Sequence, residues 1–135
     1  MSAITENTLT AKSIMPSLTV DDLQKSIAFY QALGFAVGER WEDNGKLLGV
    51  MLQAGKLQIG LSQDDWKKGR DRQKGIGLRL YVETTQNIDE LAARAKAAGV
   101  ALDKDAYDTE WKTRAVDVTD PSGFKLTIAS EAKEA

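Results

Sequence analysis

The chain of 135 residues carries a formal net charge of −2, and 42% of its residues are hydrophobic, enough for the core of one compact domain. It contains no cysteine and no histidine, which excludes disulfides, thiol nucleophiles and imidazole ligands for metals. No long basic run suits nucleic acid, and no apolar stretch suits a signal peptide or a membrane span, so we expect a cytoplasmic protein.

The first half of the chain predicts one helix among several strands. Asp21 or Asp22 can cap a helix whose apolar residues recur at helical spacing until Gly34. The dipeptide Asn44-Gly45 is typical of a tight hairpin between strands. Together these signals predict a βαβββ module over about residues 13–61, preceded by a disordered tail over 1–12. The predicted strands cover residues 14–20, 35–43, 47–53 and 56–61.

The second half repeats these signals after a charged linker over residues 62–75. Asn87 and Glu90 form a capping box for a helix that ends at Gly99. A second βαβββ module is therefore predicted over residues 76–130, with a short tail over 131–135. Its predicted strands cover residues 76–83, 100–104, 113–119 and 124–130, the last two joined by the turn sequence Asp120-Pro121-Ser122-Gly123.

The two halves match in spacing as well as in order. Val20 and Val82, at the ends of corresponding strands, are offset by 62 residues (82 − 20). Gly34 and Gly99, at the ends of the two helices, are offset by 65 residues (99 − 34). This near-constant offset predicts one structural module used twice, with a cleft between the copies.

Several short motifs, in this order on a duplicated module, resemble the vicinal oxygen chelate superfamily, which includes glyoxalase I, bleomycin-resistance proteins, fosfomycin-resistance enzymes and extradiol dioxygenases. The resemblance covers about residues 14–130 and implies an α+β fold in which tandem βαβββ modules form a curved mixed sheet around a cleft. It says little about the reaction, because one scaffold hosts unrelated chemistries. The motifs are residues 18–26, Phe29-Tyr30, Leu33-Gly34-Phe35, residues 111–114 and residues 120–123.

The resemblance also implies where a metal would be held. Metal-dependent relatives place His or Glu at positions that fall on Met15, Gln58, Gly77 and Thr127 of this chain. None of these residues is a carboxylate or an imidazole, and divalent metals need several such ligands. We therefore expect no metal and no other cofactor, which makes a metal-dependent lyase or dioxygenase an unfavoured interpretation.

Apolar residues alternate regularly along the predicted strands, so one face, with Leu48, Val116 and Leu126 among its residues, should pack against the helices. The residues of the opposite face should line the cleft. That side carries mostly small or neutral polar residues, together with the charged Arg79, Asp117 and Lys125, and no evident nucleophile. Three tryptophans are candidates for stacking against a flat ligand, although Trp66 could instead pin the linker or contact a second subunit. The candidate ligand-binding residues are Trp41, Met51, Gln58, Arg79, Tyr81, Trp111, Asp117 and Thr127.

Two of these candidates have competing interpretations. Arg79 can present its planar fork to a carboxylate or phosphate of a ligand, or it can form a structural salt bridge with Asp117 or Glu83. Trp111 can form an aromatic wall of the cleft or anchor the start of a strand. If both bind ligand, Arg79 and Trp111 should act together as an anion clamp and an aromatic wall.

Three functions are compatible with the sequence. The first is a metal-independent small-molecule binding protein of the bleomycin-resistance type, which sequesters or carries an aromatic or anionic compound. The second is a degenerate or metal-independent lyase or isomerase, in which Tyr81, Asp117 or Glu83 acts as acid or base. The third is a dimeric accessory or regulatory module. Members of this superfamily commonly complete their clefts between two chains, so a homodimer is expected, with no nucleic acid or membrane partner.

Overall fold

The computed structural model describes residue 6 and residues 8–131. Within them, the first half of the chain forms β1 (Ser17–Val20), α1 (Leu23–Leu33), β2 (Ala36–Asp43), β3 (Lys46–Ala54) and β4 (Leu57–Gln63). The second half forms β5 (Arg79–Glu83), α2 (Ile88–Ala97), β6 (Leu102–Asp108), β7 (Thr113–Thr119) and β8 (Lys125–Glu131). The predicted α+β fold of tandem βαβββ modules is confirmed.

Each module has its own four-stranded sheet. The strand order is β1-β4-β3-β2 in the first sheet and β5-β8-β7-β6 in the second. In both modules the first strand pairs in parallel with the last, and the remaining pairs are antiparallel, so both sheets are mixed. Ser17 and Arg79 begin corresponding strands and preserve the offset of 62 residues (79 − 17).

Both helices begin with the capping residues that the sequence predicts, and α1 also ends with its predicted glycine. The Asp22 side chain accepts a hydrogen bond from the Lys25 N–H and caps α1, and Gly34 ends this helix in the left-handed conformation. Asn87 caps α2 in the same way through the Glu90 N–H.

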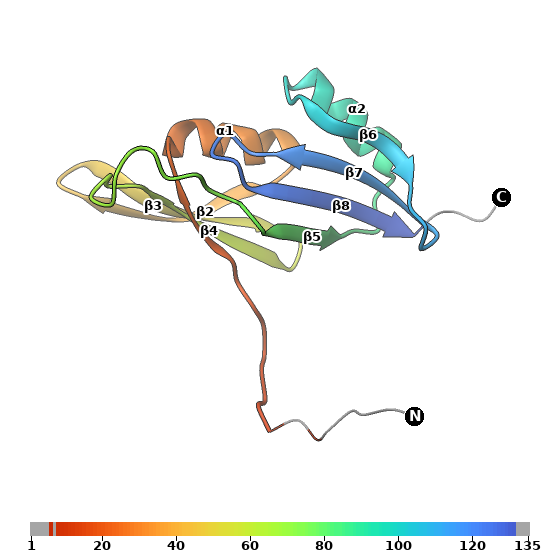
Figure 1. Cartoon of the computed structure of the whole chain (residues 1–135), viewed down its shortest axis with the longest axis horizontal. Helices are drawn as coiled ribbons and strands as arrows, with labels where there is room; N and C mark the ends of the chain where they lie inside the picture. Colours follow the sequence, from red (N-terminus) through yellow and green to blue (C-terminus); the bar gives the residue numbers. More distant parts are fainter. Residues whose placement is uncertain (1–5, 7, 132–135) are drawn as a thin grey trace.

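The core lies between the helices and one face of the sheets. Figure 1 shows α1 and α2 on the same side of the two sheets, while residues 8–16 run away from the body on the other side. Val20, Leu52, Ile59, Val116 and Leu126 point toward the helices and are almost fully buried. In the part of the chain that the structure describes, no helix covers the opposite faces, which we call the open faces (Figure 1).

A buried hydrogen-bond network ties the two modules together. Tyr30, on α1, donates its hydroxyl to Asp120 Oδ2 at 2.8 Å, and both residues are buried. Asp120 Oδ1 accepts the backbone N–H groups of Ser122, Gly123 and Phe124, each at 2.9 Å, and so shapes the turn between β7 and β8. Burial, reinforced by the neighbouring Asp120 carboxylate, raises the pKa of Tyr30, which therefore remains a donor.

A buried lysine organises the linker. Lys74 Nζ donates to Asp64 Oδ2 at 2.8 Å and also to Asp21. Burial alone would lower the pKa of Lys74, but the two carboxylates outweigh it and the pKa is raised. Trp66 packs under two cations, with Lys74 Nζ at 4.9 Å and Arg70 Cζ at 4.7 Å from its ring centroid, so this tryptophan pins the linker.

Several predicted boundaries differ from the structure. The linker is 64–78 rather than 62–75, because β4 continues to Gln63 and β5 begins only at Arg79. A turn replaces the predicted strand start at 76–78, and β6 continues to Asp108, beyond the predicted end at residue 104. Glu131 belongs to β8. Residues 1–5 and 7 of the predicted N-terminal tail, and residues 132–135 of the C-terminal tail, lie outside the described residues.

Candidate functional site

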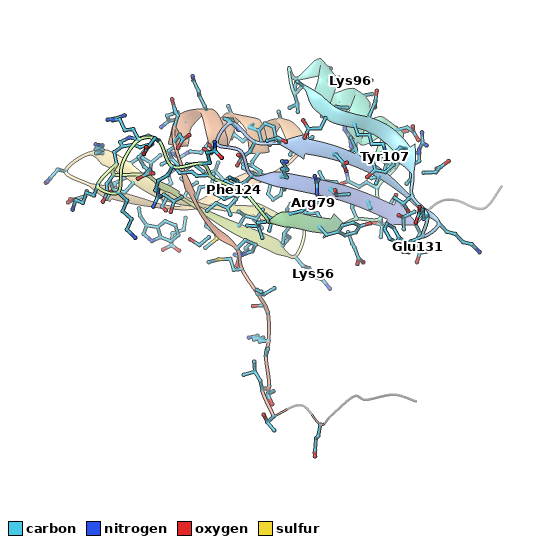
Figure 2. All side chains as sticks on the ribbon, viewed as in Figure 1. Lys56, Arg79, Lys96, Tyr107, Phe124 and Glu131 are labelled. Atoms are coloured by element: carbon cyan, nitrogen blue, oxygen red, sulfur yellow. The ribbon has the colours of Figure 1, made fainter. Side chains whose placement is uncertain are left out.

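A chain of hydrogen bonds crosses the open face of the second sheet. Arg79 Nη1, on β5, donates to Thr127 Oγ1 on β8 at 3.0 Å. Thr127 donates in turn to Asp117 Oδ1 on β7 at 2.8 Å, and the same oxygen accepts the Tyr107 hydroxyl of β6 at 2.9 Å. We call these four residues the polar chain. It spans all four strands of this sheet and fixes the orientation of Arg79 from one side; Arg79 and Tyr107 are labelled in Figure 2.

The structural salt bridge considered for Arg79 is absent from the described part of the chain. Neither Asp117 nor Glu83 lies within ion-pair distance of the guanidinium, and the neutral Thr127 hydroxyl separates Arg79 from Asp117. Arg79 is exposed on the open face. The fold therefore orients the Arg79 guanidinium, and no carboxylate among the described residues forms an ion pair with it.

Tyr107 is the member of the polar chain that sequence reasoning missed. Burial, together with the hydrogen bond to Asp117, raises the pKa of Tyr107, so it remains a donor at neutral pH. Lys104 Nζ lies 4.0 Å from the centroid of its ring. Tyr81 lies two residues beyond Arg79 on β5 and pairs with Thr127 on β8. Its side chain is 53% exposed and offers an aromatic surface beside Arg79.

The open face of the first sheet is apolar instead. Trp41, Met51, Leu48 and Met15 line a hollow of 240 Å³ on this face. A side chain at Gly49 would meet the Trp41 ring at 3.2 Å and the Leu61 carbonyl at 2.9 Å, so the missing side chain lets the indole pack closely against β3. Two of the candidate ligand-binding residues predicted from the sequence, Trp41 and Met51, therefore line the same hollow.

The remaining two candidates lie elsewhere. Gln58 is exposed near the hairpin between β3 and β4 and does not line the apolar hollow. Trp111 lies in the loop between β6 and β7. Thr113, two residues after Trp111, pairs with Glu131 on β8. Arg79 pairs with Lys125, which lies six residues (131 − 125) before Glu131 on the same strand. At about 3.3 Å per residue, this puts roughly 20 Å between Trp111 and Arg79, so they do not form one clamp within a chain.

The residues at the expected metal positions do not fit a metal. Met15 and Gly77 precede the strands, Gln58 is exposed, and the Thr127 hydroxyl is held between Arg79 and Asp117. Within residues 6 and 8–131, no group of three or more His, Cys, Asp or Glu residues gathers closely enough to hold a metal ion. Hard divalent cations need several oxygen ligands, and these positions do not supply them.

Comparison with known sequences identifies the family of the chain. The profile of the Glyoxalase/Bleomycin resistance protein/Dioxygenase superfamily matches residues 11–128. The chain belongs to this superfamily. A comparison with curated proteins found no match. In the described part of the chain, no helix has both the length and the apolar character needed to cross a membrane.

Solved structures of the superfamily share the fold. TioX from Micromonospora sp. ML1 is 18% identical, with a TM-score of 0.71 over 90% of this chain and 99% of TioX. A glyoxalase/bleomycin resistance protein/dioxygenase from Nocardioides is 18% identical, with a TM-score of 0.70 over 95% of this chain and 89% of its own. Lactoylglutathione lyase from Agrobacterium tumefaciens is 17% identical, with a TM-score of 0.64 over 90% and 94%. These likenesses establish the fold of the superfamily and leave the activity open.

Proposed function

We propose that the chain is a metal-independent binding protein for a small, flat and negatively charged compound, which it sequesters or carries. The observation that carries this proposal is the state of Arg79, which is exposed, oriented by the polar chain and without an ion-pair partner among the described residues. A guanidinium whose free N–H groups face solvent is suited to bind a carboxylate or phosphate through two parallel hydrogen bonds.

The rest of the site supports binding better than catalysis. Asp117 already accepts hydrogen bonds from Thr127 and Tyr107, so its occupied oxygen is poorly placed to abstract a proton from a ligand. Tyr81, and the Trp41 and Met51 of the apolar hollow, offer surfaces for an aromatic ring. A cationic group that binds an anion and an apolar surface that binds a ring are the parts that a small-molecule binding cleft requires.

The proposal includes a homodimer, because the two kinds of surface lie on different sheets. Met15, Trp41 and Leu48 leave more than two fifths of their surface exposed on the open face of the first sheet. A two-fold axis can bring this apolar face of one copy against the Arg79 face of another and so form two equivalent clefts. Light scattering at high micromolar concentration should give twice the chain mass of 14.8 kDa, and a monomer mass would oppose the dimer.

Titration with benzoate, a flat carboxylate, tests the role of Arg79. Arg79→Ala should weaken benzoate binding by about 1.5–3 kcal/mol, the range for a hydrogen bond to a charged group. Arg79→Lys should recover only part of this loss, because an ammonium group cannot reproduce the planar fork. Isothermal titration calorimetry at low salt measures these changes.

Arg94→Ala is the matched control, because Arg94 is also an exposed arginine but lies on α2, on the side of the helices. It should leave the affinity for benzoate unchanged. If Arg79→Ala instead lowers the melting temperature and leaves benzoate affinity intact, Arg79 is a scaffold residue and the proposal is wrong.

A further inference from the structure

We propose that Arg79 and Lys125 form a subsite for a dianionic phosphate group, as in a phosphate monoester. This inference rests on the proposed function and names the chemical class of its ligand. Arg79 and Lys125 are direct partners in the parallel pairing of β5 with β8, so their side chains leave neighbouring strands about 4.8 Å apart on the same open face.

The two cations lack neutralising partners within the described residues. Neither Arg79 nor Lys125 takes part in a salt bridge there, and both side chains are exposed. Like charges directly opposite each other on adjacent strands destabilise a sheet. A bound anion with two negative charges would relieve this repulsion, whereas a single carboxylate would neutralise only half of the charge.

The space beside the two cations is hollowed and large enough for a phosphate with a small organic group. Arg79 and Lys125 line a hollow of 420 Å³ together with Lys74, Gly123 and the segment 75–78. Lys74 does not add a third free charge, because it is already bound to Asp21 and Asp64.

The turn of the linker that lines the same hollow carries unpaired backbone donors. The Gly75 carbonyl accepts the Leu78 N–H at 3.3 Å and closes a turn over 75–78. Within the described residues, the N–H groups of Ile76 and Gly77 in this turn have no protein acceptor. Unpaired backbone N–H groups close to two cations add to the capacity of the hollow for phosphate oxygens.

The two carboxylates considered above as partners of Arg79 form no ion pair with either cation. Asp117 is engaged by Thr127 and Tyr107, and it lies two strands away from Arg79. Glu83 lies four residues along β5, about 13 Å from Arg79 at the usual rise of a strand. Neither Asp117 nor Glu83 therefore neutralises Arg79.

Three probes separate a phosphate ester from free phosphate and from a carboxylate: phenyl phosphate, inorganic phosphate and benzoate. Phenyl phosphate should bind the wild type most tightly, because it offers both the dianion and a ring for the rest of the hollow. Lys125→Ala should weaken phenyl phosphate at least about tenfold, equivalent to about 1.4 kcal/mol, and change benzoate affinity less than about threefold. Arg79→Ala should weaken both.

The pH dependence gives a second signature. The second ionisation of a phosphate monoester has a pKa near 6, so the affinity for phenyl phosphate should rise between about pH 5 and 7 as the dianion forms. This rise should flatten in Lys125→Ala. Lys56→Ala is the control, since Lys56 is an exposed lysine in the turn between β3 and β4, does not line this hollow, and should behave as the wild type.

The outcomes distinguish this inference from the proposed function. Equal affinity for phenyl phosphate and benzoate, or an unchanged phenyl phosphate affinity in Lys125→Ala, overturns the phosphate subsite. The proposed function would still be supported in that case if benzoate binding depends on Arg79. If inorganic phosphate binds as tightly as phenyl phosphate, the site takes a free anion and not an ester. If neither Arg79 nor Lys125 affects any probe, the proposed function is lost as well.

Discussion

Asp120→Ala is expected to lower the free energy of unfolding by about 3–4 kcal/mol, because it removes a buried charged acceptor and leaves several buried donors unsatisfied. The carboxylate accepts four hydrogen bonds, three from the backbone of its own turn and one from Tyr30 of the other module. Its loss should therefore weaken both the turn and the junction between modules. Urea denaturation at a fixed protein concentration measures the effect.

Two milder variants show which part of the network matters. Tyr30→Phe removes only the link between modules and should cost about 1.5 kcal/mol, while the Asp120 carboxylate keeps its three backbone donors. Asp120→Asn keeps an acceptor for the backbone donors and should be the least destabilising of the three. An Asp120→Ala variant as stable as Tyr30→Phe would show that the turn does not depend on the carboxylate.

Gly75→Ala is expected to destabilise the fold by about 2–5 kcal/mol, the sum of a steric and a backbone penalty. A Cβ at this position would lie 2.1 Å from the Gly123 carbonyl oxygen and 3.0 Å from Phe124 Cα, so the linker would have to move away from the turn between β7 and β8. Overpacking of this kind costs about 1–3 kcal/mol. The positive φ of 80° adds the penalty for a left-handed alanine, about 1–2 kcal/mol.

Gly77→Ala is the matched control, two residues away in the same turn. Its φ is 74°, but a Cβ there would have no atom within 4 Å. It should show only the conformational penalty of about 1–2 kcal/mol. Chemical denaturation of both variants separates the steric term from the backbone term, and equal stabilities would mean that the close approach of Gly75 to Gly123 is unimportant.

The fold was predictable because its signals are local and repeated. The helix caps at Asp22 and Asn87, and β7 over residues 113–119, appear where the sequence predicts them. The alternation of apolar residues also identified the buried face at Val116 and Leu126. Each of these depends on short-range geometry, which the sequence carries directly.

The errors come from bulges and from contacts between distant segments. Leu48 was expected to face the helices, but Trp41 pairs with Gly49 and Glu42 with Leu47, so a bulge leaves Leu48 without a partner and 42% exposed on the open face. Similar register shifts in β6 bring Tyr107 to the polar chain, where alternation could not place it.

The candidate site was predictable only as a set of residues on one face. The alternation of side chains along the strands predicted that Arg79, Tyr81, Asp117 and Thr127 lie on one face. They do share the open face of the second sheet. It could not show that Thr127 stands between Arg79 and Asp117, because this depends on rotamers. Nor could it separate Trp111 from Arg79, since strand register sets that distance.

A thermal-shift screen of flat anionic compounds tests the central claim most directly, because a ligand that binds the folded state raises its melting temperature. Wild type and Arg79→Ala are screened in parallel, each with a chelator and with added divalent metal. We expect compounds that stabilise the wild type equally under both conditions and lose this effect in Arg79→Ala. Stabilisation that requires the metal, or that persists undiminished in Arg79→Ala, would contradict metal-independent binding at this open face.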